Sequence, residues 1–225
     1  MILEKKTSLS QDVRLYTGFA ADDLKKLDGF MRIQHVFNSA MREVSVKLET
    51  LDDEFQIVYD HNPIHHMESR LKSPMSIADK LRRKGLEIST QSAVENLTDI
   101  AGVRVICYYL DDLYKVADML TRQDDVQLLE KVDYIVHPKE SGYRSLHLLV
   151  QVPVFLAEST QRVAVEVQMR TVAMDYWASV EHQMSYKRSA AQKNKMAPHM
   201  LAFAEELHAM DRKIQDLWRM ANGES

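Results

Sequence analysis

Two apolar runs of the chain, Val103–Cys107 and Val163–Val167, have the composition of β-strands, and each has one acidic residue with it. Asp99 lies shortly before the first run, and Glu166 lies within the second. β-branched residues favour strands, so both runs are predicted to lie in a sheet. A carboxylate inside such a strand is costly to bury unless a cation or a hydrogen-bond donor meets it. If the two strands are neighbours, their acids come together, and such a pair suits Mg²⁺. The pattern therefore predicts a sheet with a polar site on one face.

Strand alternation sharpens this prediction for the second run. Over Val163–Arg170, alternate residues from Glu166 to Arg170 fall on one face and the valines fall on the other. Two interpretations are open: Glu166 meets a metal or substrate, or it pairs with Arg170 on a solvent-facing strand. The first acid poses a parity problem, because a regular strand places Asp99 and Arg104 on opposite faces. Either the glycine between them breaks the pleat or Asp99 precedes the strand.

Helical stripes and turn signals surround the two runs. Apolar residues at spacings of three and four predict a long helix over residues 37–58, which ends at the turn-forming Asp60–Pro63. Pro74 suits the first turn of a short helix that places Lys80 and Arg83 on one face. Strands that alternate with helices predict an α/β fold with a mixed sheet. The other expected elements are helices over 111–122 and 171–185 and strands over 145–152 and 163–170, joined around Pro153.

The C-terminal segment predicts a second amphipathic helix. After a basic, polar linker over residues 187–195, apolar residues recur at spacings of three and four. The stripe consists of Met200, Phe203, Leu207, Met210, Ile214 and Leu217. The chain's own sheet can cover one apolar helix, but two such helices offer more apolar surface than one small domain covers. The chain is therefore expected to form a homo-oligomer through its terminal helices.

Composition excludes several classes of protein. The chain has 225 residues, a net charge of −4 and a sequence pI near 6.1, which argues against a protein that coats nucleic acid. Its single cysteine, Cys107, excludes an intramolecular disulfide and a paired-cysteine zinc site, and its apolar surroundings predict a buried thiol. No stretch has the length of a membrane span, and the N-terminus has no secretory signal. A cytoplasmic protein with no membrane partner is therefore expected.

Several segments together resemble the synthetase domain of the RelA/SpoT family, most closely the stand-alone small alarmone synthetases of the RelP and RelQ type. The matching segments are Ser69–Pro74, Ile77–Lys84, Asp99–Arg104, Lys139–His147 and Glu166–Ala178, followed by Glu181 and His182. The resemblance implies a nucleotidyltransferase-like fold, with a five-stranded sheet flanked by helices. The chain accordingly divides into a polar arm at 1–20, a synthetase domain at 21–187 and a C-terminal helix at 188–225. The resemblance also sets the expected oligomer as a tetramer.

The resemblance assigns roles to the acids and cations of these segments. It implies that Asp99 binds Mg²⁺, while Glu166 acts as the general base and as a second metal ligand. The implied ATP site consists of Arg70 and Arg104, which sandwich the adenine, and of Lys72, Lys80 and Arg83, which hold the phosphates. Stacking between guanidinium planes is physically reasonable, since each cation–π contact contributes ~0.5–2 kcal/mol. Taken without the resemblance, these cations fit a solvated basic face.

The loop before the expected strand pair supplies the acceptor site. The resemblance implies that Tyr143 stacks on guanine, Lys139 meets the phosphates of GDP or GTP, and Asp175 reads the guanine edge. A carboxylate can accept from both guanine N–H groups, so Asp175, where RelQ-like sequences carry Asn, suits this role. His147 and Gln168 are expected to line the same site. Taken alone, Tyr143 also fits a turn tyrosine packed on the surface.

The implied activity is transfer of the β,γ-pyrophosphate of ATP to the ribose 3′-hydroxyl of GDP or GTP, which gives ppGpp or pppGpp and AMP. The sequence has no His-Asp dipeptide, so the family's metal-dependent hydrolase motif is absent and synthesis alone is expected. The alternative is a catalytically inactive guanine-nucleotide or RNA-binding regulator, which has no need for both Asp99 and Glu166. A nucleotidyltransferase acting on RNA or antibiotics usually carries a Gly-Ser and an Asp-x-Asp pair, which are missing. His61, His65 and His66 are expected to be solvated loop residues rather than metal ligands.

Overall fold

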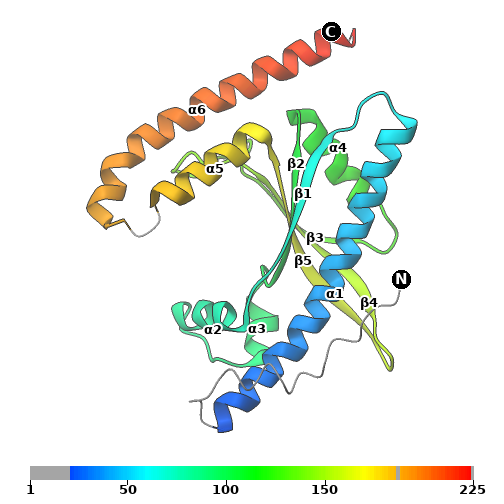
Figure 1. The fold of residues 1–225 in the computed structure, drawn as a ribbon, viewed down its shortest axis with the longest axis vertical. Coiled ribbons are helices and arrows are strands. Elements are labelled where there is room, and N and C mark those ends of the chain that lie inside the picture. Colours follow the sequence, from blue (N-terminus) through cyan, green and yellow to red (C-terminus); the bar gives the residue numbers. More distant parts are fainter. Residues whose placement is uncertain (1–20, 186–187, 224–225) are drawn as a thin grey trace, which may run out of the picture.

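The fold is built on a mixed five-stranded sheet (Figure 1). A computed structural model describes residues 21–185 and 188–223, so the expected arm at 1–20 lies outside the described residues. In spatial order the strands are β1 (Ile64–Leu71), β2 (Ala101–Cys107), β5 (Thr160–Thr171), β4 (Leu146–Phe155) and β3 (Gln127–Asp133). β2 and β5 pair in parallel, and the other neighbouring pairs are antiparallel. The predicted α/β fold with a five-stranded sheet is confirmed.

β4 and β5 form a long hairpin whose turn lies at residues 156–159. The prediction that the strands are joined around Pro153 is therefore wrong, because Pro153 lies within β4 and is paired with Arg162. Proline is tolerated there because β3 pairs with β4 only as far as Gln151. Beyond that residue β4 has no partner on its β3 side, where the missing N–H deprives no neighbouring strand of a hydrogen bond.

The helix α1 (Ala21–Val58) packs across one face of the sheet and closes the core. Its predicted apolar stripe provides the contact, since Val44 and Leu48 are fully buried in one cluster with valines of β2 and β5. The stripe ends before its last predicted member, Val58, which is 65% exposed. Cys107 is buried in the same cluster, and burial raises the pKa of its thiol. The predicted structural role of this cysteine is confirmed.

Three shorter helices connect the strands. α2 (Pro74–Arg83) begins after the N-cap residue Ser73, with Pro74 in its first turn as predicted. α3 (Thr90–Asn96) follows it, and α4 (Leu110–Thr121) links β2 to β3 where a helix is expected. Figure 1 shows α2 and α3 together at one end of the sheet. This arrangement leaves the basic last turn of α2 beside the ends of β1 and β2.

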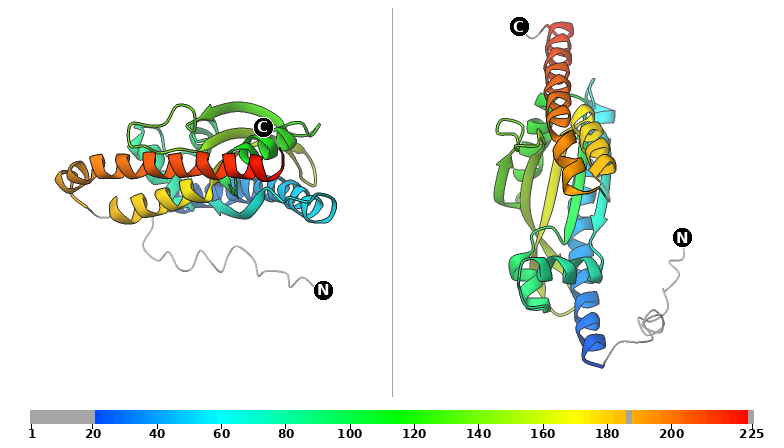
Figure 2. Two further views of the ribbon diagram at one scale, coloured as in Figure 1. Left: turned by 90° about the horizontal axis from the view of Figure 1, so that it is seen from above. Right: turned by 90° about the vertical axis from the view of Figure 1, so that its left-hand side faces the viewer.

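The last two helices, α5 (Val172–Ser185) and α6 (Ala190–Ala221), lie side by side at the other end of the sheet (Figures 1 and 2). α6 begins inside the predicted linker, so that part of the prediction is wrong. The physical reason is a capping box, in which Ser189 and Gln192 exchange side-chain and backbone hydrogen bonds at the first turn. None of the helices within 21–185 and 188–223 has both the length and the apolar character needed to cross a membrane.

The predicted apolar stripe of α6 is half-buried in its first half, where Phe203 packs on Tyr176 of α5, and is exposed in its second half. The helix packs on α5 and α4 through a face whose buried positions are Ala204, Asp211 and Gln215. The most exposed members of the stripe are Met210, at 44%, Ile214, at 40%, and Leu217, at 64%. The domain therefore leaves much of this stripe in contact with solvent.

Candidate active site

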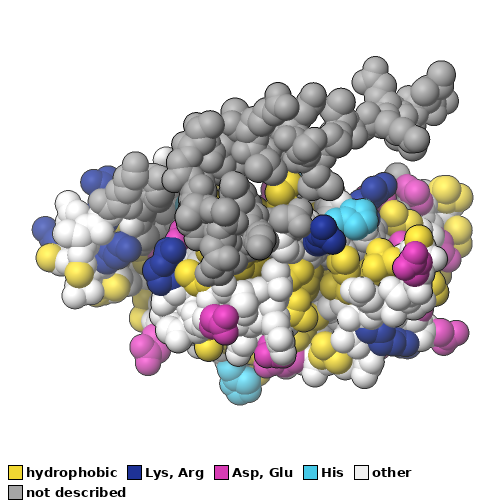
Figure 3. Space-filling view, turned by 90° about the horizontal axis from the view of Figure 1, so that it is seen from below, with side chains coloured by type: hydrophobic (Ala, Val, Ile, Leu, Met, Phe, Trp, Pro, Cys, Tyr) yellow, Lys and Arg dark blue, Asp and Glu magenta, His cyan; other side chains and the backbone are white. Residues whose placement is uncertain are grey.

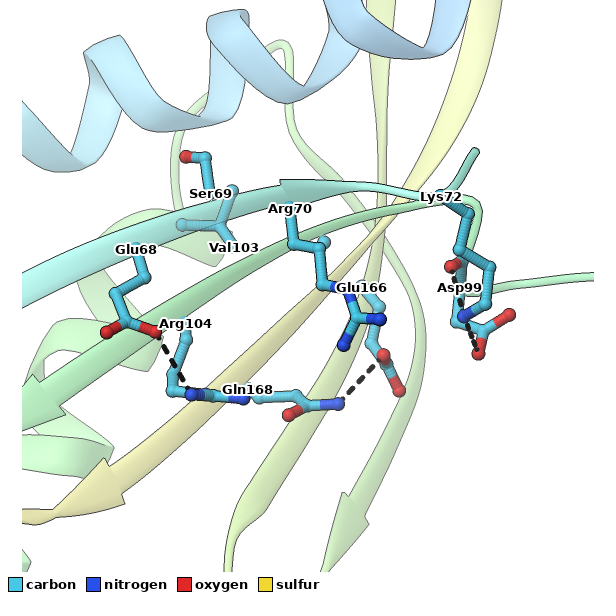
Figure 4. A pocket seen from close by; sticks show the side chains of 10 residues that line it. Glu68, Ser69, Arg70, Lys72, Asp99, Val103, Arg104, Glu166 and Gln168 are labelled. Atoms are coloured by element: carbon cyan, nitrogen blue, oxygen red, sulfur yellow. Dashed lines mark hydrogen bonds and ion pairs between the residues drawn. The ribbon is translucent and has the colours of Figure 1, made fainter. Parts of the chain in front are cut away.

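A cavity of about 760 Å³ opens on the polar face of β1, β2 and β5 (Figure 4). Strand register aligns many of its lining residues in two rows across the three strands. One row contains Arg70, Gly102 and Glu166, and the next contains Glu68, Arg104 and Gln168. Gly102 has no side chain, which leaves the floor open between Arg70 and Glu166. Figure 4 shows these two side chains pointing into the same space, away from α1.

Asp99 lies at one end of this cavity, before β2 rather than within it, which resolves the parity problem. Its Oδ2 atom accepts hydrogen bonds of 2.6 Å from Lys72 Nζ and from Lys80 Nζ. Burial raises the pKa of Asp99, but the hydrogen bonds and charges of the two lysines outweigh burial, and its net pKa lies below the usual value. Asp99 is therefore a carboxylate at neutral pH, held between two ammonium groups.

The surroundings of Asp99 fit a divalent cation that arrives with a nucleotide. Asp99 Oδ1 is buried and has no hydrogen-bond partner among the described residues. Glu166 lines the same cavity, close enough for the charge of Asp99 to raise its pKa. Within the described part of the chain, no group of three or more acidic, histidine or cysteine ligands is formed. Mg²⁺ is commonly held by one or two carboxylates together with substrate phosphates, so this pair of acids suits it.

Glu166 is held by side chains of β4 and β5. Gln168 Nε2 donates to Glu166 Oε2 over 2.9 Å, and His147 Nδ1 lies 3.3 Å from Glu166 Oε1. Burial raises the pKa of Glu166, but these two neighbours lower it by more, so its net pKa lies below the usual value. Arg170 pairs with Asp175 instead, so the interpretation that Glu166 pairs with Arg170 is wrong. Glu166 is an oriented carboxylate that can accept a proton from a group in the cavity.

Tyr143 is the centre of an aromatic and cationic cluster beside Glu166. Its Oη lies 2.9 Å from His147 Nε2 and accepts a hydrogen bond of 2.9 Å from Arg170 Nη2. Lys139 Nζ lies 5.0 Å from the ring centroid, and Arg170 Cζ lies 5.2 Å from it. The alternative of a turn tyrosine on the surface is wrong, because Tyr143 is partly buried within this network. The ring has the setting of a stacking platform.

Arg170 is predicted only as an alternative partner of Glu166 and not as a site residue, yet it connects two parts of the site. Its side chain is 7% exposed and Nη1 donates to Asp175 Oδ1 over 3.0 Å. Arg104 Nη1 lies 3.7 Å from the same oxygen and donates to Glu68 Oε2 over 3.0 Å. Asp175 thus contacts one arginine of the Tyr143 cluster and one of the implied ATP site. A signal for Arg170 was available, since strand alternation places it on the face of Glu166.

Residues 69–191, more than half of the chain's 225 residues, match the family model of a region found in RelA / SpoT proteins. The matched range contains Asp99, Glu166 and the cluster around Tyr143. The chain belongs to the RelA/SpoT family. The resemblance inferred from the sequence is confirmed.

Relatives of known name or structure cover most of this chain. GTP pyrophosphokinase YwaC of Bacillus subtilis (strain 168) is 39% identical over 194 residues, which cover 86% of this chain and 92% of YwaC. Small alarmone synthetase 1 of Bacillus subtilis, solved bound to its product pppGpp, has a TM-score of 0.77 and 32% identity, over 86% of this chain and 98% of that chain. Small alarmone synthetase 2 of Bacillus subtilis has a TM-score of 0.73 and 36% identity, over 83% and 97%.

Arg83 is the implied ATP ligand that the structure does not bring to the cavity. Lys80, on the same helix, reaches Asp99, whereas Arg83 is exposed and its Nε donates to the carbonyl of Asp79 over 3.4 Å. Figure 3 shows basic side chains on the side of the molecule where α2 lies in Figure 1. A contact between Arg83 and ATP phosphates stays a prediction.

The expectation of three solvated loop histidines is correct only in part, because His61 lies in the loop but is partly buried, whereas His65 and His66 are exposed but lie in a strand. His61 is partly buried, its Nε2 lies 2.9 Å from Asp112 Oδ2, and its ring centroid lies 4.4 Å from that of Trp218. His65 and His66 lie in β1, which begins at Ile64, and both are exposed. His61 therefore belongs to the contact between α4 and α6 rather than to a solvated loop.

Proposed function

We propose that this chain is a GTP pyrophosphokinase that transfers pyrophosphate from ATP to the 3′-hydroxyl of GDP or GTP, making ppGpp or pppGpp and AMP. The observation that carries the proposal is the cavity shared by Asp99 and Glu166, with lysines at one end and the Tyr143 cluster beside it. The name of YwaC and the product bound to small alarmone synthetase 1 support the same activity. Mg²⁺ is the proposed cofactor, held by Asp99 and Glu166.

Glu166 is the proposed general base. Its carboxylate accepts the proton of the acceptor 3′-hydroxyl while that oxygen attacks the β-phosphorus of ATP. The new oxygen–phosphorus bond forms as the bond between the β-phosphorus and the oxygen that bridges it to the α-phosphorus breaks. AMP leaves with the electron pair of the broken bond. His147 and Gln168 fix the orientation of the carboxylate, and such positioning is a large part of catalysis in phosphoryl transfer. Mg²⁺, when bound, neutralises charge on the phosphates.

Lys72 and Lys80 are the proposed phosphate ligands on the donor side. Both ammonium groups contact Asp99 Oδ2 in the structure. When ATP binds, its phosphates can replace Asp99 as the partner of both lysines, which leaves Asp99 to bind the metal ion. Arg70 and Arg104 project from adjacent strands into the cavity, where guanidinium groups can stack on the adenine. The donor site is therefore assembled from β1, β2 and α2.

The Tyr143 ring is the proposed platform for guanine. Lys139 and Arg170 lie over the ring, so a base that stacks on the part of the ring covered by a cation must displace that cation. Arg170 is buried and bonded to Asp175, whereas Lys139 is exposed, so Lys139 is the group that moves. Its ammonium then becomes available to the acceptor phosphates, which is the role implied for it by the family.

The competing function is a regulator that binds guanine nucleotides or RNA without catalysis. The presence of both Asp99 and Glu166 on one cavity favours the enzyme, because a binder needs no general base. Purified protein incubated with ATP, GDP and Mg²⁺ should release AMP and ppGpp in equal amounts, measured by anion-exchange chromatography. Binding of GDP without any product would instead support the regulator. A cytoplasmic location, where these nucleotides are available, stays a prediction.

Tyr143→Ala is expected to raise the KM for GDP about tenfold while the KM for ATP changes little, because base–aromatic stacking contributes ~1–3 kcal/mol and serves only the acceptor. Arg70→Ala is the converse variant and should raise the KM for ATP. Initial rates measured against each nucleotide in turn separate the two effects. Equal changes in both KM values for either variant would mean that the two sites are wrongly assigned.

We also propose that the chain assembles as a homo-oligomer, and that it is a tetramer. The support is the outward apolar face of α6, where Met210, Ile214 and Leu217 are exposed in a single chain. The other terminal helix contributes less than expected, because the stripe of α1 is largely buried on the chain's own sheet. The proposed contact is therefore the C-terminal helix.

Ile214→Asp combined with Leu217→Asp should reduce the mass measured by light scattering, because two buried charges at an apolar contact are costly. A wild-type mass of 26.0 kDa at micromolar concentration would refute the oligomer. Circular dichroism of the double variant checks that the domain remains folded, as expected from the exposure of both residues. Arg212→Asp, an exposed change on the opposite side of the same helix from the stripe, is the control.

A further inference from the structure

Helix α6 packs directly against the loop that carries Tyr143. Gly142, the residue before it, has a φ of +88°, and a Cβ there would lie 2.6 Å from Ala204 Cβ and 3.2 Å from Leu201 Cδ1. The helix therefore approaches the loop as closely as a glycine allows. The N–H of Gly142 donates to the carbonyl of Lys139 over 2.8 Å, which closes the turn beneath the helix. The place of this turn depends on where α6 lies.

Arg144 provides a second contact between the loop and α6. Its Nη1 donates to the carbonyl of Ile135 over 2.7 Å, and its Nη2 donates to Glu205 Oε1 over 2.9 Å. The Arg144 side chain is 10% exposed and that of Glu205 is 55% exposed, so the guanidinium is held inside the domain and the carboxylate meets it from the surface. Arg144 directly follows Tyr143, and Ile135 directly follows Tyr134, whose ring packs edge-on against that of Tyr143. Glu205 thereby anchors both sides of the loop.

Asp211 provides a third contact, this time with the beginning of α5. Its Oδ2 accepts a hydrogen bond of 2.7 Å from Thr171 Oγ1, which in turn accepts one of 3.1 Å from the N–H of Met174. This arrangement satisfies a backbone donor in the first turn of α5. Asp175 lies in that same turn and holds Arg170 beside Tyr143. Asp211 thus supports the other wall of the acceptor site.

We propose that Glu205 and Asp211 of α6 are positioning residues for the acceptor nucleotide, acting through Arg144 and Thr171. This proposal rests on the proposed function, which assigns the Tyr143 cluster to GDP or GTP. The donor residues on α2 lie at the opposite end of the sheet from α6 (Figure 1). Loss of the Glu205 contact should therefore raise the KM for GDP and leave the KM for ATP unchanged. Loss of the Asp211 contact should raise the KM for GDP more than the KM for ATP, because Asp175 also lies 3.7 Å from Arg104.

The first test replaces Glu205, which touches neither nucleotide in the proposed site. Glu205→Ala should raise the KM for GDP about threefold, within the range of coupling energies measured for ion pairs. Glu205→Gln keeps an oxygen that can accept from Arg144 and should restore most of the wild-type KM. Glu206→Ala removes the neighbouring exposed carboxylate of the same helix and should behave as the wild type. Asp211→Asn, which keeps an acceptor for Thr171, should likewise be milder than Asp211→Ala.

The second test changes the close contact itself. Gly142→Ala should raise the KM for GDP about tenfold, because a left-handed φ is strained for alanine and its Cβ meets Ala204. Adding Ala204→Gly removes the Cβ with the shortest contact and should recover part of the loss. A KM for ATP that stays at the wild-type value shows that the variants are folded.

The outcomes separate the two proposals. If the wild type makes no product from ATP and GDP, the proposed function fails. If the wild type is active but Glu205→Ala leaves the KM for GDP unchanged, or raises the KM for both nucleotides equally, the positioning role is overturned. The positioning role is also overturned if the KM for GDP of Glu205→Gln is no lower than that of Glu205→Ala. Selective loss with rescue supports it.

Discussion

Glu166→Gln is expected to lower turnover by about 10²–10⁴-fold, the contribution typical of a general base. The change removes the basicity of the side chain while keeping its size and an oxygen that accepts from Gln168 Nε2. The lysines that contact Asp99 are unaffected, so the Kd for ATP should remain close to that of the wild type. AMP release measures turnover, and calorimetry with a non-hydrolysable ATP analogue measures binding.

Glu158→Gln is a matched control for this variant, because Glu158 is exposed in the turn between β4 and β5. It should retain wild-type turnover. If Glu166→Gln keeps more than about a tenth of wild-type turnover, Glu166 is not the base, since a base contributes at least ~10²-fold. If ATP binding is lost together with turnover, the variant has disturbed the cavity rather than the proton transfer alone.

The central elements of the fold could be predicted because their apolar periods are regular. In α1, Val44 and Leu48 repeat at the spacing of one helical face and are both fully buried. In β5, Val165 and Val167 are buried while Glu166 between them faces the cavity, as strand alternation requires. Where only one face of a helix or strand packs on the core, the apolar residues of that face recur at a regular spacing in the sequence.

The two outer strands, β1 and β3, show no regular alternation of apolar and polar residues, and the sequence does not predict them. In β1, only Ile64 is buried, and in β3 the adjacent Leu128 and Leu129 are both exposed, at 41% and 45%. Each of these strands has a partner on one side only, and it packs little of its surface against the core. A strand that buries so little needs no alternation of apolar and polar residues, so no period marks it.

Most residues of the candidate site could be identified from their motifs, but the contacts between their side chains could not. Asp99 and Glu166 do line one cavity, as the adjacent strands predicted. The link from Arg170 through Asp175 to Arg104 joins three different elements and leaves no local pattern. Gly142 is a similar case, because its glycine suggests only a flexible turn. The need for a glycine comes from α6, which lies some sixty residues further along the chain.

Asp99→Asn is expected to affect metal-dependent turnover and metal-free ATP binding in opposite directions. With Mg²⁺ present, turnover should fall by about a hundredfold or more, because a catalytic metal contributes several kcal/mol of charge stabilisation. Without Mg²⁺, ATP should bind about three- to tenfold more tightly than to the wild type. In the wild type, the Asp99 carboxylate accepts hydrogen bonds from Lys72 and Lys80, so it competes with the ATP phosphates for both ammonium groups. Its negative charge also repels the phosphates, and the variant lacks that charge.

Calorimetric titration of ATP in EDTA and in excess Mg²⁺ distinguishes these effects, with Asp79→Asn as the control. Asp79 is exposed on α2 and pairs with Arg82, so its loss removes one negative charge nearby without changing the contacts of Asp99. Weaker ATP binding by Asp99→Asn in EDTA would contradict the competition and mean that Asp99 holds the two lysines in place for phosphate. Tighter binding in EDTA together with lost Mg²⁺ activation is the result expected of a metal ligand. In that case Asp99 exchanges its two ammonium partners for the cation when the nucleotide enters, because the buried Oδ1 atom has no other partner among the described residues.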